Sequence, residues 1–281
     1  MRTVWQKESP WRYLNPALPF ISLWKCRDLL FQFIKRNILV FYKGTTLGVV
    51  WIIITPAAML LVYTFVFSVI FKTHWGSEFG DSKFAFAMIM FCGLTLFNIF
   101  SESAMTSLIS ISNTPSYVKK VVFPLEILPV ASVLSAVFLG TIWFIFLLVG
   151  TVTVMHKMSL SFICLPLLVA NLFLLCCGVG WFVASLGVYL RDLAHILRIG
   201  LQMLCFATPV FYNLEMVPEK FRSLLLLNPL TVIIQTARQV LFYGQWPDWN
   251  ALGLNFLFAV LIFQAGYTWF MRSKRWFADV V

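Results

Sequence analysis

The sequence predicts an all-α polytopic membrane protein with six transmembrane helices, an N-terminal interfacial amphipathic helix and re-entrant segments before the last helix. Hydrophobic residues make up 60% of the 281-residue chain and charged residues only 11%, whereas a soluble domain carries about 25% charged residues. Apolar runs long enough to cross a bilayer follow one another. Basic residues lie mostly at the ends of these runs, so we assign the net charge of +10 to a membrane environment rather than to nucleic acid.

The chain divides into three parts: a cytoplasmic lead-in with the interfacial helix (1–46), a six-span transmembrane domain (47–271) and a cytoplasmic tail (272–281). On a helical wheel, residues 22–43 place Lys35, Arg36 and other polar side chains in one sector opposite an apolar one, which Arg27 and Asn37 interrupt. Ser22 is the expected N-cap of this helix and Gly44 its expected stop. The helix is either a membrane anchor or a lever against a cytoplasmic partner.

The apolar runs with clear limits are Leu47–Phe71, Phe84–Ser110, Leu125–Met155, Phe162–Leu190 and Ala251–Met271, and a fifth span precedes the last of them. The second run carries Asn98 and Glu102. An ionisable residue within a span is costly and is therefore a functional candidate. Alternatively, Glu102 lies near the cytoplasmic end of the run, where water hydrates it.

A basic elbow, residues 113–129, connects the second and third spans. It opens on helix-breaking residues, continues with Lys119 and Lys120, and closes on Phe123 and Pro124. Paired lysines beside a span mark the cytoplasmic side. The elbow is therefore a place where a soluble partner can push.

A second charged connection, Arg191-Asp192, follows the fourth span. With this topology, 15 of the 21 lysines and arginines lie on the same side as the amino terminus. This bias predicts that both termini are cytoplasmic.

The stretch 200–244 is apolar but broken. Three proline positions interrupt it, and its pieces are short for spans. Irregular backbone at membrane depth is tolerated only where protein covers it or a wet cavity meets it. We interpret the stretch as a fifth span followed by re-entrant gate segments; the alternative is a fifth span with an amphipathic surface helix. The gate candidates are Pro209, Glu215, Arg222, Asn228, Pro229 and Arg238.

Motifs for several kinds of chemistry are absent from the sequence. It has no G-x-x-x-x-G-K-[ST], no H-E-x-x-H and no G-x-S-x-G. Its six cysteines form no C-x-x-C pair and its three histidines fall in three different connections, which favours buried thiols over a metal site. We therefore expect neither catalysis nor metal binding by this chain.

Short motifs along the whole chain occur in an order that resembles the permease subunits of type-2 ABC exporters, in the polysaccharide branch with O-antigen and teichoic acid permeases. They are Tyr42-Lys43-Gly44, Leu47-Gly48, Trp51 with Pro56, Asn113, Val118-Lys119-Lys120-Val121, Phe123-Pro124-Leu125-Glu126, Arg191-Asp192, Pro209-Val210 with Tyr212, and Asn228-Pro229. None is specific alone, and their order and spacing carry the resemblance.

The resemblance implies a homodimer in the bacterial inner membrane that binds two copies of a separate P-loop ATP-binding subunit. ATP and magnesium would then sit on that subunit, and this chain would hold no cofactor. The cargo would be a glycan linked to undecaprenyl diphosphate, with no role for nucleic acid. The residues implied in coupling to the ATPase are Lys35, Arg36, Lys119, Lys120, Phe123, Pro124, Arg191 and Asp192.

The resemblance places the passage between two protomers, lined by spans one, two and five. The residues expected along it are Trp51, Tyr63, Asn98, Glu102, Thr208 and Tyr212. Aromatic residues make up 17% of the chain, which suits a sugar passage, although lipid-facing belts explain many of them. Two alternatives remain: an exporter of a drug, haem or lipid in the same class, and a membrane-embedded glycan transferase.

Overall fold

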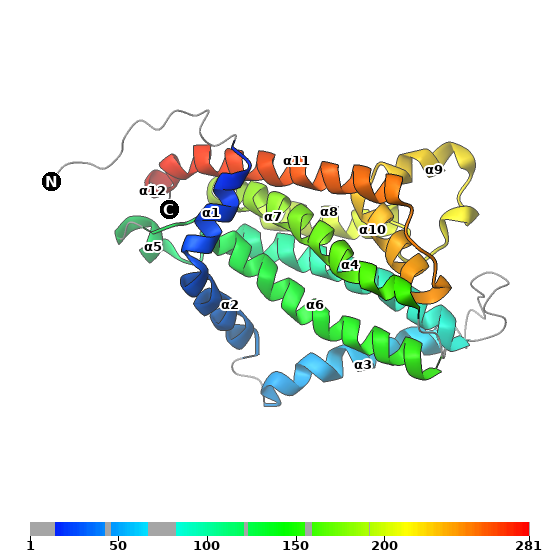
Figure 1. Cartoon of the computed structure of the whole chain (residues 1–281). Helices are drawn as coiled ribbons and strands as arrows, with labels where there is room; N and C mark the ends of the chain where they lie inside the picture. The colour runs from blue at the N-terminus through cyan, green and yellow to red at the C-terminus, as the bar shows by residue number, and fades with distance from the viewer. Residues whose placement is uncertain are drawn as a thin grey trace.

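The computed structural model describes residues 15–42, 46–66, 83–120, 123–154, 159–190 and 192–280. Every regular element within these ranges is helical (Figure 1). Four of the helices are long and apolar enough to cross a membrane: α4 (Lys83–Ile109), α6 (Ile127–Val154), α7 (Leu165–Tyr189, preceded by the 3₁₀ turn η4, Leu160–Cys164) and α11 (Trp249–Ser273). The helical class predicted from composition is confirmed.

The four long helices form the core of the bundle. α4 packs against α6 and α7, and α7 packs against α11. Glycines allow the closest of these contacts, because a Cβ at Gly266 of α11 would collide with the backbone of Gly178 in α7. Small residues at helix contacts let backbones approach closely within a membrane. Gly178 of this contact lies within the fourth predicted span, Phe162–Leu190.

The N-terminal part differs from the single helix predicted over 22–43. It consists of α1 (Ala17–Lys25) and α2 (Arg27–Tyr42), separated by a break at Cys26. Ser22 lies inside α1, so the prediction that it caps a helix is wrong; its hydroxyl donates to a side chain 104 positions away. α2 packs on α6. Gly44 falls outside the described residues, and the placement of α2 at a membrane surface stays a prediction.

Two shorter apolar helices correspond to the first and fifth predicted spans. α3 (Trp51–Tyr63) follows the short turn η2 (Gly48–Val50), and its helical path continues to Val66. α8 covers Leu193–Ala207. At 1.5 Å per residue, helices of 15–16 residues extend about 24 Å, less than the hydrocarbon core of about 30 Å. Among the described residues, the structure therefore supports four spans, or five with the bent pair described next. The predicted end of the first span, Phe71, lies outside them, and six stays a prediction.

The broken stretch contains η5 (Leu214–Met216), α9 (Glu219–Leu226) and α10 (Pro229–Arg238), which continues as the π-helical turn η6 (Gln239–Tyr243). The chain bends by 99° between α9 and α10, as in a broken span or a re-entrant loop. The bend occurs where Asn228-Pro229 was expected to interrupt the helix.

Two sets of short elements lie at opposite ends of the bundle (Figure 1). α1, α5 (Pro115–Lys120) and α12 (Phe277–Val280, preceded by η7, Lys274–Trp276) lie at one end, and α9 and α10 lie at the other. We call them the elbow end and the gate end. The predicted elbow thus contains a short helix, and the third predicted span starts as helix α6 two residues later than expected.

Candidate functional site

A groove runs along the face formed by α3, α4 and α6. Its first cavity has a volume of about 450 Å³ and brings together three of the predicted passage residues, Trp51, Asn98 and Glu102. The remaining lining residues are Ile52, Thr55, Thr95, Ile99, Ser101, Ala136, Leu139, Gly140 and Trp143. Two indole rings therefore share one cavity with hydroxyls, an amide and a carboxyl group.

A second cavity of about 360 Å³ extends the groove to the N-terminal helix α2. It shares Glu102, Ala136 and Leu139 with the first cavity, so the two are continuous. Arg36 and Asn37 of α2 line it. Its other polar lining residues are Thr106, Ser110, Asn113, Thr114, Ser132 and Ser135. We call the two cavities together the α4–α6 groove.

The groove offers hydrogen-bonding groups beside apolar surface. Hydroxyl and amide groups both donate and accept hydrogen bonds, as a polyhydroxylated ligand requires, and indole faces supply flat apolar area. Glu102 lies at the junction of both cavities, on the face of α4 where Asn98 also opens. The sequence reasoning missed Trp143 and Ser101, although helical periodicity from Asn98 places Ser101 one turn away.

The other predicted passage residues lie outside the lining of this groove. Tyr63 is half-buried on α3. Thr208 is fully buried and bonds to the gate end. The hydroxyl of Tyr212 donates to the carbonyl of Phe206 at 3.1 Å. The structure therefore divides the six residues, with three in the groove and two of the others beside the gate end.

A buried guanidinium organises the gate end. Arg238 of α10 is 1% exposed, and it donates to the carbonyl of Pro209 at 2.7 Å and to that of Val210 at 2.6 Å. Its Nε donates to the carbonyl of Ile89 in α4 at 3.2 Å. One side chain thus joins α10, the end of α8 and α4, because a guanidinium presents several donors in a rigid plane.

Asn228 connects the same region from the other end of α10. Its Oδ1 accepts from the backbone amide of Leu230 at 3.0 Å as an N-cap, and its Nδ2 donates to Oγ1 of Thr208 at 2.8 Å. Pro229 occupies the first turn of α10, where a missing N–H costs nothing. The Pro229 carbonyl accepts from Nδ2 of Asn255 in α11 at 2.7 Å.

Glu215 and Arg222 lie farther out than this cluster. Arg222 donates to the carbonyls of Glu215 and Val217 at 3.1 and 3.2 Å. The Glu215 carboxylate accepts from Nδ2 of Asn213 at 3.3 Å, and Glu215 itself is exposed. The structure thus divides the predicted gate residues into an inner set, in which Pro209 and Arg238 are buried and Asn228 and Pro229 half-buried, and an outer pair, Glu215 in η5 and Arg222 in α9.

At the elbow end, aromatic rings join the N-terminal helix to the elbow. Phe33 of α2 is 5% exposed, with ring centroids 5.6 Å from Tyr117 and 5.6 Å from Phe123. Arg36 lies over the Phe33 ring at 4.3 Å and, like Lys35, is exposed. Phe33 thus connects α2 with α5 and with the segment that precedes α6.

The remaining coupling candidates are placed less completely. Lys119 and Lys120 end α5, and their side chains fall outside the described part. Pro124 is half-buried behind Phe123. Arg191 lies outside the described residues, whereas Asp192 is exposed immediately before α8.

Within the described residues, no group of three histidine, cysteine, aspartate or glutamate side chains is arranged to hold a metal ion. All six cysteines there are free thiols. The candidate site therefore consists of the α4–α6 groove, the buried Arg238 and the aromatic contact around Phe33.

Comparison with known proteins gives one family match, described as ABC-2 type transporter, over residues 28–242. An O-antigen export system permease protein RfbA of Klebsiella pneumoniae is 26% identical over 259 residues, covering 90% of this chain and 95% of the relative. A protein of the same name from Myxococcus xanthus is 28% identical over 263 residues, covering 92% and 98%. The polysialic acid transport protein KpsM of Escherichia coli is 24% identical over 212 residues, covering 75% and 79%.

Proposed function

Because this chain belongs to the ABC-2 type transporter family, we propose that it is the membrane permease of an ATP-driven exporter of polysaccharide. The observation that carries the proposal is the similarity, over at least 90% of this chain, to relatives named as O-antigen export permeases. A relative named for polysialic acid transport supports the same substrate class. This chain would then transport and not catalyse.

The proposed cargo is a glycan linked to undecaprenyl diphosphate. The α4–α6 groove suits such a molecule, because it combines two indole rings with hydroxyl and amide groups and has Arg36 at its α2 end. A guanidinium binds phosphate oxygens well, whereas the polyprenyl tail prefers the surrounding lipid. Sugars would follow the polar side of the groove.

The proposed assembly is a homodimer with two copies of a separate P-loop ATP-binding subunit. The sequence contains no nucleotide-binding motif of that kind, so the energy for transport would come from the partner, which would bind ATP and magnesium. In a homodimer, the grooves of two protomers would face a common passage. The exposed apolar side chains of α3, which include Trp51 and Ile53, are available for such a contact.

The proposed location is the bacterial inner membrane, with the elbow end in the cytoplasm. Of the 21 lysines and arginines, 15 lie on that side in the predicted topology. Exposed Lys35 and Arg36, together with Lys119 and Lys120, would then face the ATP-binding subunit. Nucleotide-driven closure of the partner would move α2 and α5 and thereby bias a two-state membrane body.

Depletion of the protein tests this function. Completed polyprenyl-linked glycan is expected to accumulate on the cytoplasmic side and to disappear from the cell surface. Normal display of glycan would refute the polysaccharide assignment and favour a drug, haem or lipid exporter. Loss of all glycan synthesis would favour the transferase.

The groove is tested with two α6 aromatic residues. Trp143→Ala removes an indole from the groove, whereas Phe138→Ala removes a ring that is 52% exposed on the outer face of the same helix. Export is expected to fall only in the first variant, at equal membrane abundance. Equal export by both would exclude the groove from the path.

Coupling is tested by Lys119→Glu combined with Lys120→Glu. Insertion is expected to be normal and export to be lost, because the reversed charges would repel an acidic partner surface. Normal export by this double variant would remove the elbow from the coupling mechanism.

A further inference from the structure

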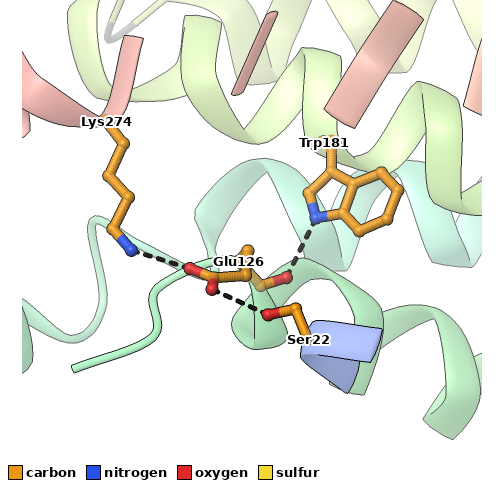
Figure 2. A network of polar contacts seen from close by, with 4 residues as sticks. All are labelled: Ser22, Glu126, Trp181 and Lys274. Carbon is orange, nitrogen blue, oxygen red and sulfur yellow. Dashed lines mark hydrogen bonds and ion pairs between the residues drawn. The ribbon is translucent and has the colours of Figure 1, made fainter. Parts of the chain in front are cut away.

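One buried carboxylate joins segments that are far apart in the chain. Glu126, just before α6, is 6% exposed. Its Oε2 lies 2.7 Å from Nζ of Lys274 in η7, and its Oε1 accepts a hydrogen bond of 3.0 Å from the hydroxyl of Ser22 in α1. Its backbone carbonyl accepts from Nε1 of Trp181 in α7 at 2.9 Å. Figure 2 shows these donors converging on Glu126 from three elements.

Aromatic packing holds the C-terminal segment in the same place. Phe277 is fully buried, with ring centroids 5.5 Å from Phe270 and 6.1 Å from Tyr189. The Tyr189 hydroxyl donates to the carbonyl of Ser273 at 3.3 Å. α12 contacts both α5 and α7. The segment expected to be a short basic tail is therefore packed against the elbow helix.

The N-terminal helix is held from a neighbouring side. The ring of Phe20 in α1 stacks on Phe263 of α11 at 5.2 Å, and Phe263 packs against Trp181 at 5.0 Å. Ser22, on the same helix as Phe20, reaches the Glu126 carboxylate. Trp181 therefore contacts both Phe263 and Glu126, the two residues that Phe20 and Ser22 of α1 contact.

The buried Glu126 carboxylate requires its partners to be in place when the protein folds. A buried carboxylate is costly unless it is paired and hydrogen-bonded, and the partners of Glu126 come from the two ends of the chain. The Lys274 side chain is 22% exposed, so this ion pair is also reachable by solvent. An apolar residue at position 126 would pack without requiring either partner. The charge thus favours one arrangement of the three segments.

We propose that Glu126 is a positioning residue for coupling, and that Ser22, Glu126 and Lys274 form a clamp, the Glu126 clamp. It fastens α1 and the C-terminal segment to the start of α6, so that a push on α2 or α5 moves these segments as one unit. The coupling part of this inference rests on the proposed function, whereas the clamp itself does not. Without the clamp, movement of the elbow would be absorbed locally instead of reaching α6 and α7.

The clamp is tested on the purified complex carrying a C-terminal epitope tag. Chymotrypsin release of the tag is measured for Lys274→Gln and Glu126→Gln, because neither substitution removes an aromatic cleavage site. Arg272→Gln is the matched control, because Arg272 is an exposed cation two residues before Lys274. We expect tag release to be about tenfold faster in Lys274→Gln and Glu126→Gln, because each breaks the ion pair. The effect is moderate because a partly exposed ion pair stabilises a structure less than a fully buried one does. The control is expected to behave as wild type.

A charge-swap variant tests whether the specific Glu126–Lys274 pair protects the tag, or whether the single variants merely loosen the C-terminal segment. Glu126→Lys combined with Lys274→Glu is expected to restore protection of the tag and most of the export, whereas either reversal alone loses both. In the single variants, ATP hydrolysis is expected to continue with less polysaccharide exported per ATP. Membrane abundance is measured in parallel, and the milder Ser22→Ala replaces any variant that fails to accumulate.

Three results would overturn the proposal: unchanged protection in Lys274→Gln, a swap variant as sensitive as the single reversals, or loss of protection with an unchanged ratio of export to ATP hydrolysis. Failure of the proposed function has a different signature. If the wild-type protein exports no polysaccharide, the protease assay still decides whether the clamp exists.

Discussion

The two ends of the bundle are each organised around one buried charge, but of opposite sign. At the elbow end, the carboxylate of Glu126 has side-chain donors from Ser22 and Lys274. At the gate end, the guanidinium of Arg238 donates to the main-chain carbonyls of Ile89, Pro209 and Val210. The partners of Glu126 are side chains, which substitution can change, whereas these partners of Arg238 are main-chain carbonyls, which substitution leaves in place.

Side-chain partners at one end and main-chain partners at the other predict different rigidity for the two ends. The side-chain partners of Glu126 tie separate segments together, and the 22% exposed side chain of Lys274 leaves this ion pair reachable by solvent. A guanidinium enclosed by carbonyls is rigid, since losing it leaves several buried acceptors without donors. We therefore predict that the gate end, around Arg238, is the more rigid of the two ends.

The largest expected effect is that of Arg238→Met at the gate end. Removing the guanidinium leaves the carbonyls it contacts without these donors, which we expect to cost about 5 kcal/mol of stability. Protein abundance and export should both fall. Arg222→Met is the matched control, because Arg222 also donates to two carbonyls but is only half-buried. Thermal unfolding of both purified variants checks this, and equal losses would contradict the comparison.

The next largest effect is expected at the aromatic contact of the elbow end. Phe33→Ala removes a buried ring between Tyr117 and Phe123, at a cost of about 3 kcal/mol. Phe31→Ala, on the same helix, removes a ring that is 68% exposed and should change little. The melting temperature and ATP-coupled export of both variants are to be measured. If the two variants behave alike, α2 does not transmit force through Phe33.

A smaller effect is expected at the start of α10. Asn228→Ala removes both the N-cap and the bond to Thr208, and loss of an N-cap costs about 1 kcal/mol. Thr208→Val removes the bond to Asn228 and the bond from the Thr208 hydroxyl to the carbonyl of Leu204 but leaves the cap intact, and Asn228→Asp keeps the capping oxygen. Stability should therefore be lowest for Asn228→Ala. Chemical denaturation measures the stability of each variant. If Thr208→Val lost as much stability as Asn228→Ala, the cap would be unimportant.

The smallest change is a shift in thiol reactivity beside the Glu126 clamp. Burial and, next, the Glu126 carboxylate raise the pKa of the Cys26 thiol. Because the thiolate is the reactive form, the raised pKa slows alkylation at pH 8. Glu126→Gln removes one cause, so the pKa should fall and alkylation should speed up at that pH. Mass spectrometry of the Cys26 peptide measures this, with Cys205 in α8 as the internal control; slower alkylation in the variant would contradict it.

Many features of this protein follow from its sequence alone. The membrane class, the limits of the long helices and the break at Asn228-Pro229 depend on local composition. Lipid demands long apolar helices, and a helix usually ends at or before the residue that precedes a proline, although Pro56 lies inside α3. The sequence also allowed us to predict that Asn98 and Glu102 line a passage, because polar residues on one face of a span mark a surface lined by protein or water.

The partners of the buried charges were decided only by the tertiary structure. Ser22 looked like an N-cap but bonds to Glu126, 104 positions away, and Lys274 looked like part of a tail but pairs with Glu126, 148 positions away. Arg238 was predicted as a gate residue, and only the structure shows that its guanidinium donates to the carbonyls of Ile89 and Pro209. The reason is physical: a buried ionisable group must be satisfied wherever the chain path brings a partner, and that path depends on how the helices pack.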